Sequence, residues 1–163
     1  MENYNENEKK IEQIIAEKGE IISSTQGVSM YPMLRNRKDM VVIEKPSKRP
    51  AINDVVLYRA PGGKLLLHRI IKDLGTEYII RGDNRLNKEY GVTPERIIGV
   101  LKGFYRDGKY YDCKKSLIYR IYVLSVRPSY PFRFLWQKFI RPVLSKLKRI
   151  LIKSMALIKN VKK

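Results

Sequence analysis

The chain has 163 residues, of which 44% are hydrophobic and 31% charged, so it has room for one ordinary globular domain and a short appendage. This composition excludes a disordered or collagen-like protein. A single cysteine and a single histidine exclude an internal disulfide and argue against a Cys/His zinc cluster, and we expect no cofactor.

The positive charge is concentrated towards the C-terminal end. The whole chain carries 34 Lys and Arg against 16 Asp and Glu, a formal net charge of +18. From Lys114 onward there are 14 basic residues and no acidic ones, whereas residues 1–113 hold 20 basic and 16 acidic residues. This asymmetry indicates an anionic partner for the tail, either a membrane surface or nucleic acid.

The sequence shows no membrane-spanning or export segment. No apolar run reaches the roughly 20 residues that cross a bilayer, and the stretch at 117–126 is short and interrupted by Arg120. Residues 1–20 alternate in charge and contain no apolar stretch followed by a cleavage site, unlike a secretory signal peptide. We expect a cytoplasmic protein, with peripheral attachment to the inner face of the membrane as the alternative.

The first expected element is a short amphipathic helix over residues 7–18. Ile11, Ile14 and Ile15 recur at helical spacing among Glu and Lys, and Gly19 follows where a helix would stop. Residues 1–19 are therefore assigned to an N-terminal amphipathic helix.

Residues 20–113 predict a compact β domain. Turn-forming sequences separate its strand-like segments, and Asp107-Gly108 between two aromatic-rich segments is a strong hairpin signal. Because no long helix separates the segments, the pattern favours a mainly β, mostly antiparallel fold over a parallel α/β sheet. The segments rich in Val, Ile and aromatic residues are 40–44, 54–58, 64–71, 77–80 and 97–105.

Residues 114–163 predict a basic, amphipathic helical tail, with a proline-containing linker at 127–131. Most basic side chains after Phe132 fall off the apolar stripe of the expected helix. This pattern is typical of an interfacial helix on an anionic membrane. We favour that reading over a helix packed on the domain or on another subunit, and over binding of nucleic acid. The stripe comprises Trp136, Ile140, Val143, Leu147, Ile150 or Leu151, Ile158 and Val161.

Three residues of the β domain could take part in chemistry, although each has an ordinary structural explanation. Ser29 lies in a loop stiffened by Pro32, and a serine nucleophile needs a base within hydrogen-bond reach. His68 lies in an apolar strand, where a single histidine is more often structural than catalytic. Asp83 lies in a turn-forming Gly-Asp-Asn sequence.

Read in chain order, five short segments resemble the type I signal peptidase family and its S24/S26 relatives. The similarity spans about residues 20–106. In this superfamily some members use a lysine as the base for the serine and others a histidine, so the chain resembles the Ser-His branch. The five segments are Ser-Met-Tyr-Pro-Met-Leu at 29–34, Asn-Asp-Val-Val-Leu-Tyr at 53–58, His-Arg-Ile-Ile at 68–71, Gly-Asp-Asn at 82–84 and Ile-Ile-Gly-Val at 97–100.

The resemblance implies a role for each candidate residue. Ser29 would be the nucleophile, His68 the general base, and Asp83 the acid that orients the imidazole. Glu89 rivals Asp83, because this branch often has a further acidic residue shortly after its Gly-Asp-Asn. The Ser29 N–H would donate to the oxyanion.

The resemblance also places Gly27 and Met30 in the oxyanion and substrate pocket. Gly27 stands where many members have a serine that adds a second oxyanion donor, and Met30 would line the substrate pocket. In the family, an extended peptide adds to the sheet by main-chain pairing, with small side chains preferred next to the cut.

We therefore expect a serine endopeptidase that cleaves a peptide or a precursor protein. The family's N-terminal transmembrane anchor is not found in this sequence, so processing of secreted preproteins does not follow from the resemblance. The alternative is a non-catalytic or self-cleaving regulatory protein of the same fold, with a tail that binds nucleic acid or a membrane. The simultaneous presence of Ser29 and His68, and too little chain before residue 20 for a helix-turn-helix motif, favour the peptidase.

Overall fold

The computed structural model describes residues 2–126, 128–140, 142–144, 146, 147 and 149. The chain divides into two units, Met1–Val126 and Arg127–Lys163. The first unit contains every strand among the described residues and both candidate residues of the dyad, Ser29 and His68.

The chain begins with helix α1 (Glu2–Lys18), which starts earlier than the 7–18 expected from the isoleucine spacing. It ends at Gly19, whose N–H donates to the Ile15 carbonyl at 3.0 Å. Ile15 is buried in the core of the β domain, so the apolar side of α1 packs on the sheet.

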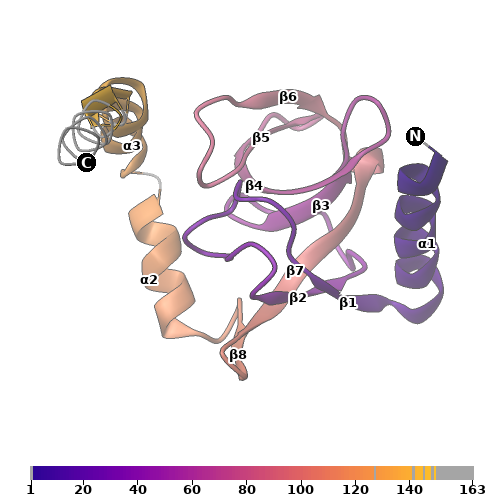
Figure 1. Ribbon diagram of the computed structural model, residues 1–163. Coiled ribbons are helices and arrows are strands. Elements are labelled where there is room, and N and C mark those ends of the chain that lie inside the picture. The colour runs from indigo at the N-terminus through magenta and orange to yellow at the C-terminus, as the bar shows by residue number, and fades with distance from the viewer. Residues whose placement is uncertain (1, 127, 141, 145, 148, 150–163) are drawn as a thin grey trace, which may run out of the picture. The chain divides into compact units, whose positions relative to one another are not determined.

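The β domain is a single antiparallel sheet, which confirms the predicted fold class (Figure 1). The strands follow the order β1-β2-β7-β3-β4-β5-β6, and β8 pairs with β7. A short 3-10 helix, η1 (Pro94–Arg96), leads into β7. The strands are β1 (Glu20–Ser24), β2 (Met40–Glu44), β3 (Val55–Arg59), β4 (Leu65–Asp73), β5 (Tyr78–Arg81), β6 (Glu89–Val92), β7 (Ile97–Arg106) and β8 (Lys109–Asp112).

Both faces of the central strands are buried, because side chains alternate across each strand. In β3, Val55 and Leu57 join one apolar cluster with Ile15, whereas Val56 and Tyr58 join a second cluster with Ile80. β4 lies antiparallel to β3 and pairs His68 with Val56. Directly paired residues share a face of the sheet, so His68 lies on the side of the second cluster.

Two irregularities bend the half of the sheet that carries His68. The register shifts between Ile70 and Lys72 in the β4–β5 pair, and between Tyr78 and Ile80 in the β5–β6 pair. Bulges of this kind increase local twist and bend a strand. Figure 1 shows β3, β4, β5 and β6 curling round rather than lying flat.

The expected hairpin at Asp107-Gly108 is confirmed between β7 and β8, where Arg106 pairs with Lys109. Its two turn residues have φ values of 50° and 77°, the positive values that a two-residue hairpin turn of this kind requires.

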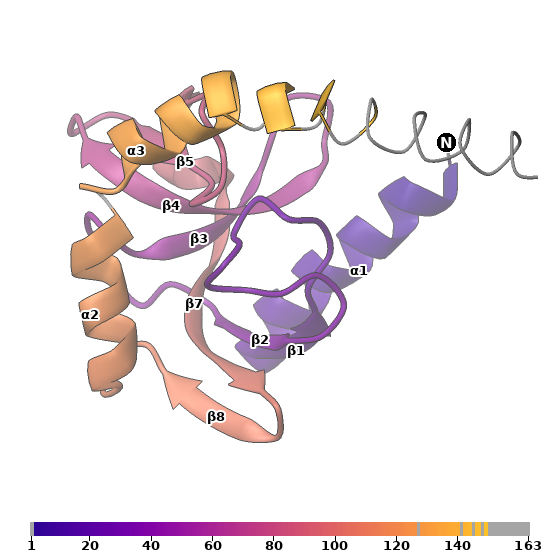
Figure 2. The same cartoon turned by 60° about the vertical axis from the view of Figure 1, so that its left-hand side comes forward.

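Helix α2 (Leu117–Val126) follows β8 and belongs to the first unit. Tyr119 and Val126 are buried, and Tyr119 packs in the first apolar cluster. Both α1 and α2 contribute to this cluster, and Figures 1 and 2 show the two helices apart from each other, at different ends of the β domain. The boundary placed at residue 114 is therefore wrong for α2, because its tyrosines complete the core of the β domain.

The second unit contains α3 (Tyr130–Leu135) and a π-helical turn, η2 (Trp136–Ile140). Helix therefore begins inside the segment 127–131 that we expected to be a linker. Trp136, Ile140, Val143 and Leu147 of the expected stripe are exposed. The rest of that stripe, at positions 150, 151, 158 and 161, lies outside the described residues. Among the helices that the structure describes, none has the length and apolar character needed to cross a bilayer.

Candidate active site

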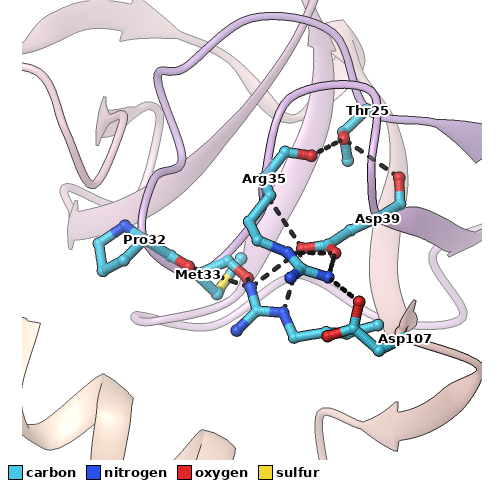
Figure 3. A network of polar contacts seen from close by, with 7 residues as sticks. Thr25, Pro32, Met33, Arg35, Asp39 and Asp107 are labelled. Atoms are coloured by element: carbon cyan, nitrogen blue, oxygen red, sulfur yellow. Dashed lines mark hydrogen bonds and ion pairs between the residues drawn. The ribbon is translucent and has the colours of Figure 1, made fainter.

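Ser29 lies in the long connection between β1 and β2, and a buried carboxylate at the end of that connection organises it (Figure 3). Asp39 is 1% exposed and accepts hydrogen bonds from the Arg35 backbone N–H at 2.8 Å and from its guanidinium at 2.7 and 2.9 Å. The Thr25 hydroxyl donates to the carbonyls of Arg35 and Asp39. These bonds join the start of the connection, at Thr25, to its end, at Arg35 and Asp39.

Arg106 ties the same connection to β7. Its guanidinium donates to Asp39 at 3.0 Å and to the carbonyls of Pro32 and Met33 at 3.0 and 2.6 Å. Burial by itself raises the pKa of Asp39, but hydrogen bonds from Arg35 and Arg106 outweigh it and hold this pKa below its ordinary value. The segment that carries Ser29 therefore closes around a carboxylate that stays charged at neutral pH.

His68 is the base candidate, and its Nδ1 faces two oxygen atoms. Glu89 Oε1 lies 2.7 Å from Nδ1, and the Tyr58 hydroxyl oxygen lies 3.3 Å from it. The Tyr58 hydroxyl also contacts the second carboxylate oxygen of Glu89, to which it donates. Because the Tyr58 hydroxyl donates its proton to Glu89, both oxygen atoms near Nδ1 act as hydrogen-bond acceptors.

This arrangement favours the tautomer of His68 that carries its proton on Nδ1. A donor at Nδ1 satisfies the Glu89 carboxylate and the Tyr58 oxygen, whereas a bare Nδ1 would face two acceptors. The lone pair then lies on Nε2, which is the atom a general base uses to accept a proton. The contacts at Nδ1 thus prepare Nε2 for that task.

Gly82 lies beside both His68 Nε2 and the backbone of the Ser29 segment. A Cβ added at Gly82 would lie 3.0 Å from His68 Nε2 and 2.8 Å from the Ser29 carbonyl oxygen, so only glycine allows this approach. The Asn84 N–H donates to the same Ser29 carbonyl at 2.7 Å. The Gly-Asp-Asn segment therefore joins the Ser29 segment to β4, as an arrangement of serine and histidine around one centre requires.

The pKa of His68 is shifted below its ordinary value near 6.5. Burial is the main cause, since the residue is 4% exposed and a charged imidazole loses hydration there. The Glu89 carboxylate acts in the opposite direction, and the nearby Arg85 guanidinium adds to the lowering. His68 is therefore neutral at pH 7 and able to accept a proton.

Asp83 meets a different partner, which corrects the role expected for it. Its carboxylate accepts two hydrogen bonds from the Arg69 guanidinium, at 2.9 and 2.7 Å, and one from the Tyr122 hydroxyl at 3.0 Å. The side chains of Arg69 and Asp83 are both 0% exposed. Arg69 follows His68 in β4, so the two side chains point to opposite faces of the strand. The carboxylate at Nδ1 of His68 is that of Glu89, and Asp83 neutralises Arg69.

Ser29 and His68 line one groove of about 680 Å³, together with Gly27, Met30 and Glu89. Ser29 is half-buried, and Met30 is buried against the first apolar cluster while reaching the groove wall. The Gly27 N–H donates to the Asn36 side chain at 2.8 Å. That bond uses the donor that would have served as a second oxyanion contact, so Gly27 shapes the groove instead.

Sequence reasoning missed Tyr58, Arg69 and Tyr122 as parts of the site. For Arg69 a signal was present, because an arginine inside an apolar strand requires a buried carboxylate partner. Tyr58 reaches Glu89 only through the β3–β4 register and the bend of the sheet, and Tyr122 reaches Asp83 only because α2 packs on the domain. No local pattern contains either fact.

Comparison of the sequence with protein-family models and with curated proteins finds no match. The link to the signal peptidase superfamily therefore remains a resemblance carried by five short segments.

Proposed function

We propose that the protein is a serine endopeptidase in which Ser29 is the nucleophile, His68 the general base and Glu89 the orienting carboxylate. The observation that carries the proposal is the contact of Glu89 and Tyr58 with His68 Nδ1, which leaves Nε2 free beside the Ser29 segment in an open groove. A histidine with a merely structural role has no need of an unoccupied lone pair beside a groove.

In the proposed reaction, His68 Nε2 removes the hydroxyl proton as Ser29 Oγ attacks the peptide carbonyl. The Ser29 N–H donates to the oxyanion that develops. The imidazolium then returns the proton to the leaving amine, which gives an acyl-enzyme. Water, deprotonated by His68, attacks the ester carbon; the second product leaves as the acid, and the serine regains its proton. Glu89 stabilises the imidazolium in both halves of the reaction.

The proposed substrate is an extended peptide. The groove is lined on one side by β1 residues Ser23 and Ser24 and on another by β4 residues Leu65 to His68. β1 stands at the end of the strand order in the described part of the chain, so a peptide can add to its outer edge by main-chain hydrogen bonds.

The test is cleavage of a mixture of peptides of random sequence, followed by mass spectrometry of the products. We expect cut peptides with the wild-type protein, and none with Ser29→Ala or His68→Ala at equal protein concentration. Ser47→Ala, in the connection between β2 and β3, is the matched control and should cut like the wild type. Equal cleavage by wild type and Ser29→Ala would contradict the proposal.

A further inference from the structure

Helix α2 is apolar on both sides, although only one side is covered. Tyr119 and Val126 are 8% and 0% exposed and face the domain. Leu117, Ile118, Ile121 and Leu124 are 67%, 65%, 58% and 77% exposed, and we call these four residues the outer face of α2. In an ordinary surface helix the side away from the core is polar.

The four side chains of the outer face form one patch, because residues separated by three, four or seven positions lie on the same side of a helix. Single exposed apolar residues are common on protein surfaces, but a contiguous patch usually marks a contact site. The outer face of α2 therefore has the character of a contact site.

The charges around the helix indicate the chemistry of that partner. Lys114 and Lys115 precede α2 and Arg120 lies within it, and all three are exposed. From Lys114 to the C-terminus the sequence has 14 basic and no acidic residues. A surface that offers aliphatic side chains flanked by cations is complementary to a bilayer with anionic headgroups.

We infer that the outer face of α2 binds an anionic membrane surface, with Leu117, Ile118, Ile121 and Leu124 in the acyl boundary and the neighbouring cations at the headgroups. A second copy of the chain fits less well, because it brings the same positive charge to the contact. Nucleic acid fits less well too, because single strands are held by stacking on aromatic rings and this face is aliphatic.

The second unit, taken by itself, carries the same combination. Phe132, Trp136 and Phe139 are exposed, and Lys138 lies among them. Tryptophan and other aromatic side chains favour the headgroup level of a bilayer. Both parts of the chain after Lys114 therefore offer what an interfacial contact requires. The inference concerns a partner of the protein and does not rest on the proposed peptidase activity.

The first experiment places a fluorescent reporter on the outer face. Trp136 is the only tryptophan in the chain, so Trp136→Phe removes the protein's own tryptophan fluorescence. In that background, Leu124→Trp should shift to shorter wavelength and be quenched by brominated lipid when vesicles of phosphatidylcholine with about a quarter phosphatidylserine are added. Leu74→Trp, at another exposed position, in the turn between β4 and β5, is the control and should not respond. An unchanged Leu124→Trp spectrum with vesicle-bound protein would overturn the inference.

The second experiment removes the apolar face from the full-length chain. Ile121→Ser with Leu124→Ser should weaken sedimentation with the same vesicles by at least about ten-fold, since both side chains lose a favourable transfer into the membrane. Leu74→Ser should bind like the wild type. Equal binding by the double variant would overturn the inference. The inference would also be overturned if analytical ultracentrifugation found a dimer for the wild type and a monomer for the double variant, because the outer face would then hold a second copy of the chain.

Discussion

The β domain and the chain after Lys114 differ in the balance of their charges and in the exposure of their apolar residues. Residues 1–113 hold 20 basic and 16 acidic residues, and the buried carboxylates Asp39 and Asp83 each meet an arginine. The sequence after Lys114 contains no carboxylate side chain, although Lys114 itself pairs with Glu44 of β2 at 3.2 Å. The large apolar residues from Leu117 to Leu147 are mostly exposed. The first region completes its own interactions, whereas the second leaves both charge and apolar surface for a partner.

Helix α2 shares features of both regions, because one of its sides packs on the β domain and the other is exposed. On the inner side, Tyr119 accepts a hydrogen bond from Arg69 and Tyr122 donates one to Asp83, both within the buried network of the β domain. On the outer side, aliphatic residues lie among cations. Substitutions on the inner side and in the β domain should therefore affect stability or turnover, and those on the outer side should affect neither.

After the loss of cleavage expected for Ser29→Ala and His68→Ala, the largest expected effect is that of Glu89→Gln on turnover. The amide cannot stabilise the imidazolium and can present its NH₂ group to Nδ1, so kcat/KM should fall by about 10²–10⁴-fold. The melting temperature should change little, because Glu89 is partly exposed. The peptide-cleavage assay measures the effect, and Glu95→Gln, on η1, serves as the control. Activity within two-fold of wild type would remove Glu89 from the proposed triad.

Asp83→Asn should instead reduce stability. It leaves the Arg69 guanidinium buried without a counter-charge, which costs about 3–5 kcal/mol in the free energy of unfolding. Asp73→Asn removes an ion pair with Arg49 that is open to solvent, and it should cost much less than Asp83→Asn. Urea denaturation of both variants measures the difference. Similar costs for the two would show that burial of the Arg69–Asp83 pair has no energetic consequence.

The pH dependence of turnover follows from the shift at His68. Its pKa lies below the ordinary value near 6.5, and the neutral imidazole is the active form, so activity is lost only as pH falls through that lowered pKa. We expect kcat/KM to be flat from neutral pH upward and to fall about ten-fold per unit on the acid side. A profile that still rises above pH 8 in His68→Ala would identify another base.

Tyr122→Phe tests whether α2 supports the buried pair. The variant keeps the ring and removes one hydrogen bond to a charged group, which should lower the free energy of unfolding by about 1.5–3 kcal/mol. Tyr90→Phe alters an exposed ring on β6 and should leave stability unchanged. Wild-type stability in Tyr122→Phe would place α2 outside the β domain's network.

The smallest expected effect on folding is that of Leu124→Ser. The side chain is 77% exposed, so the free energy of unfolding should stay within about 0.5 kcal/mol of wild type. Binding to vesicles with phosphatidylserine should weaken in the same variant. A large loss of stability would show that the outer face of α2 packs within the folded chain.

Much of the sheet could be predicted because its local signals agree. β2 and β3 are short apolar runs rich in β-branched residues, and Asp107-Gly108 between two aromatic-rich segments is a strong signal for a tight hairpin turn. β6 was missed because Glu-Tyr-Gly-Val has neither alternation nor length, and α2 was assigned to the tail because its charge resembles that of the tail.

The candidate site was predictable only in part. Order and spacing along the chain identified Ser29 and His68, but the choice between Asp83 and Glu89 depends on which face of β4 each carboxylate reaches. That choice follows from strand register, two bulges and the packing of α2, which are properties of the folded chain. The adjacent pair His68-Arg69 contained a partial signal, since two neighbouring strand residues need partners on opposite faces.

The central claim is that burial keeps His68 neutral and that Glu89 holds the ring proton on Nδ1, which leaves the free lone pair at Nε2. It can be tested without knowing the substrate. His68 is the only histidine, so a long-range ¹H–¹⁵N correlation spectrum shows its two ring nitrogens without assignment. At pH 7 we predict a neutral imidazole protonated on Nδ1, a pKa below 6.5, and loss of this tautomer preference in Glu89→Gln. A charged ring at pH 7, or a neutral ring protonated on Nε2, would contradict the account.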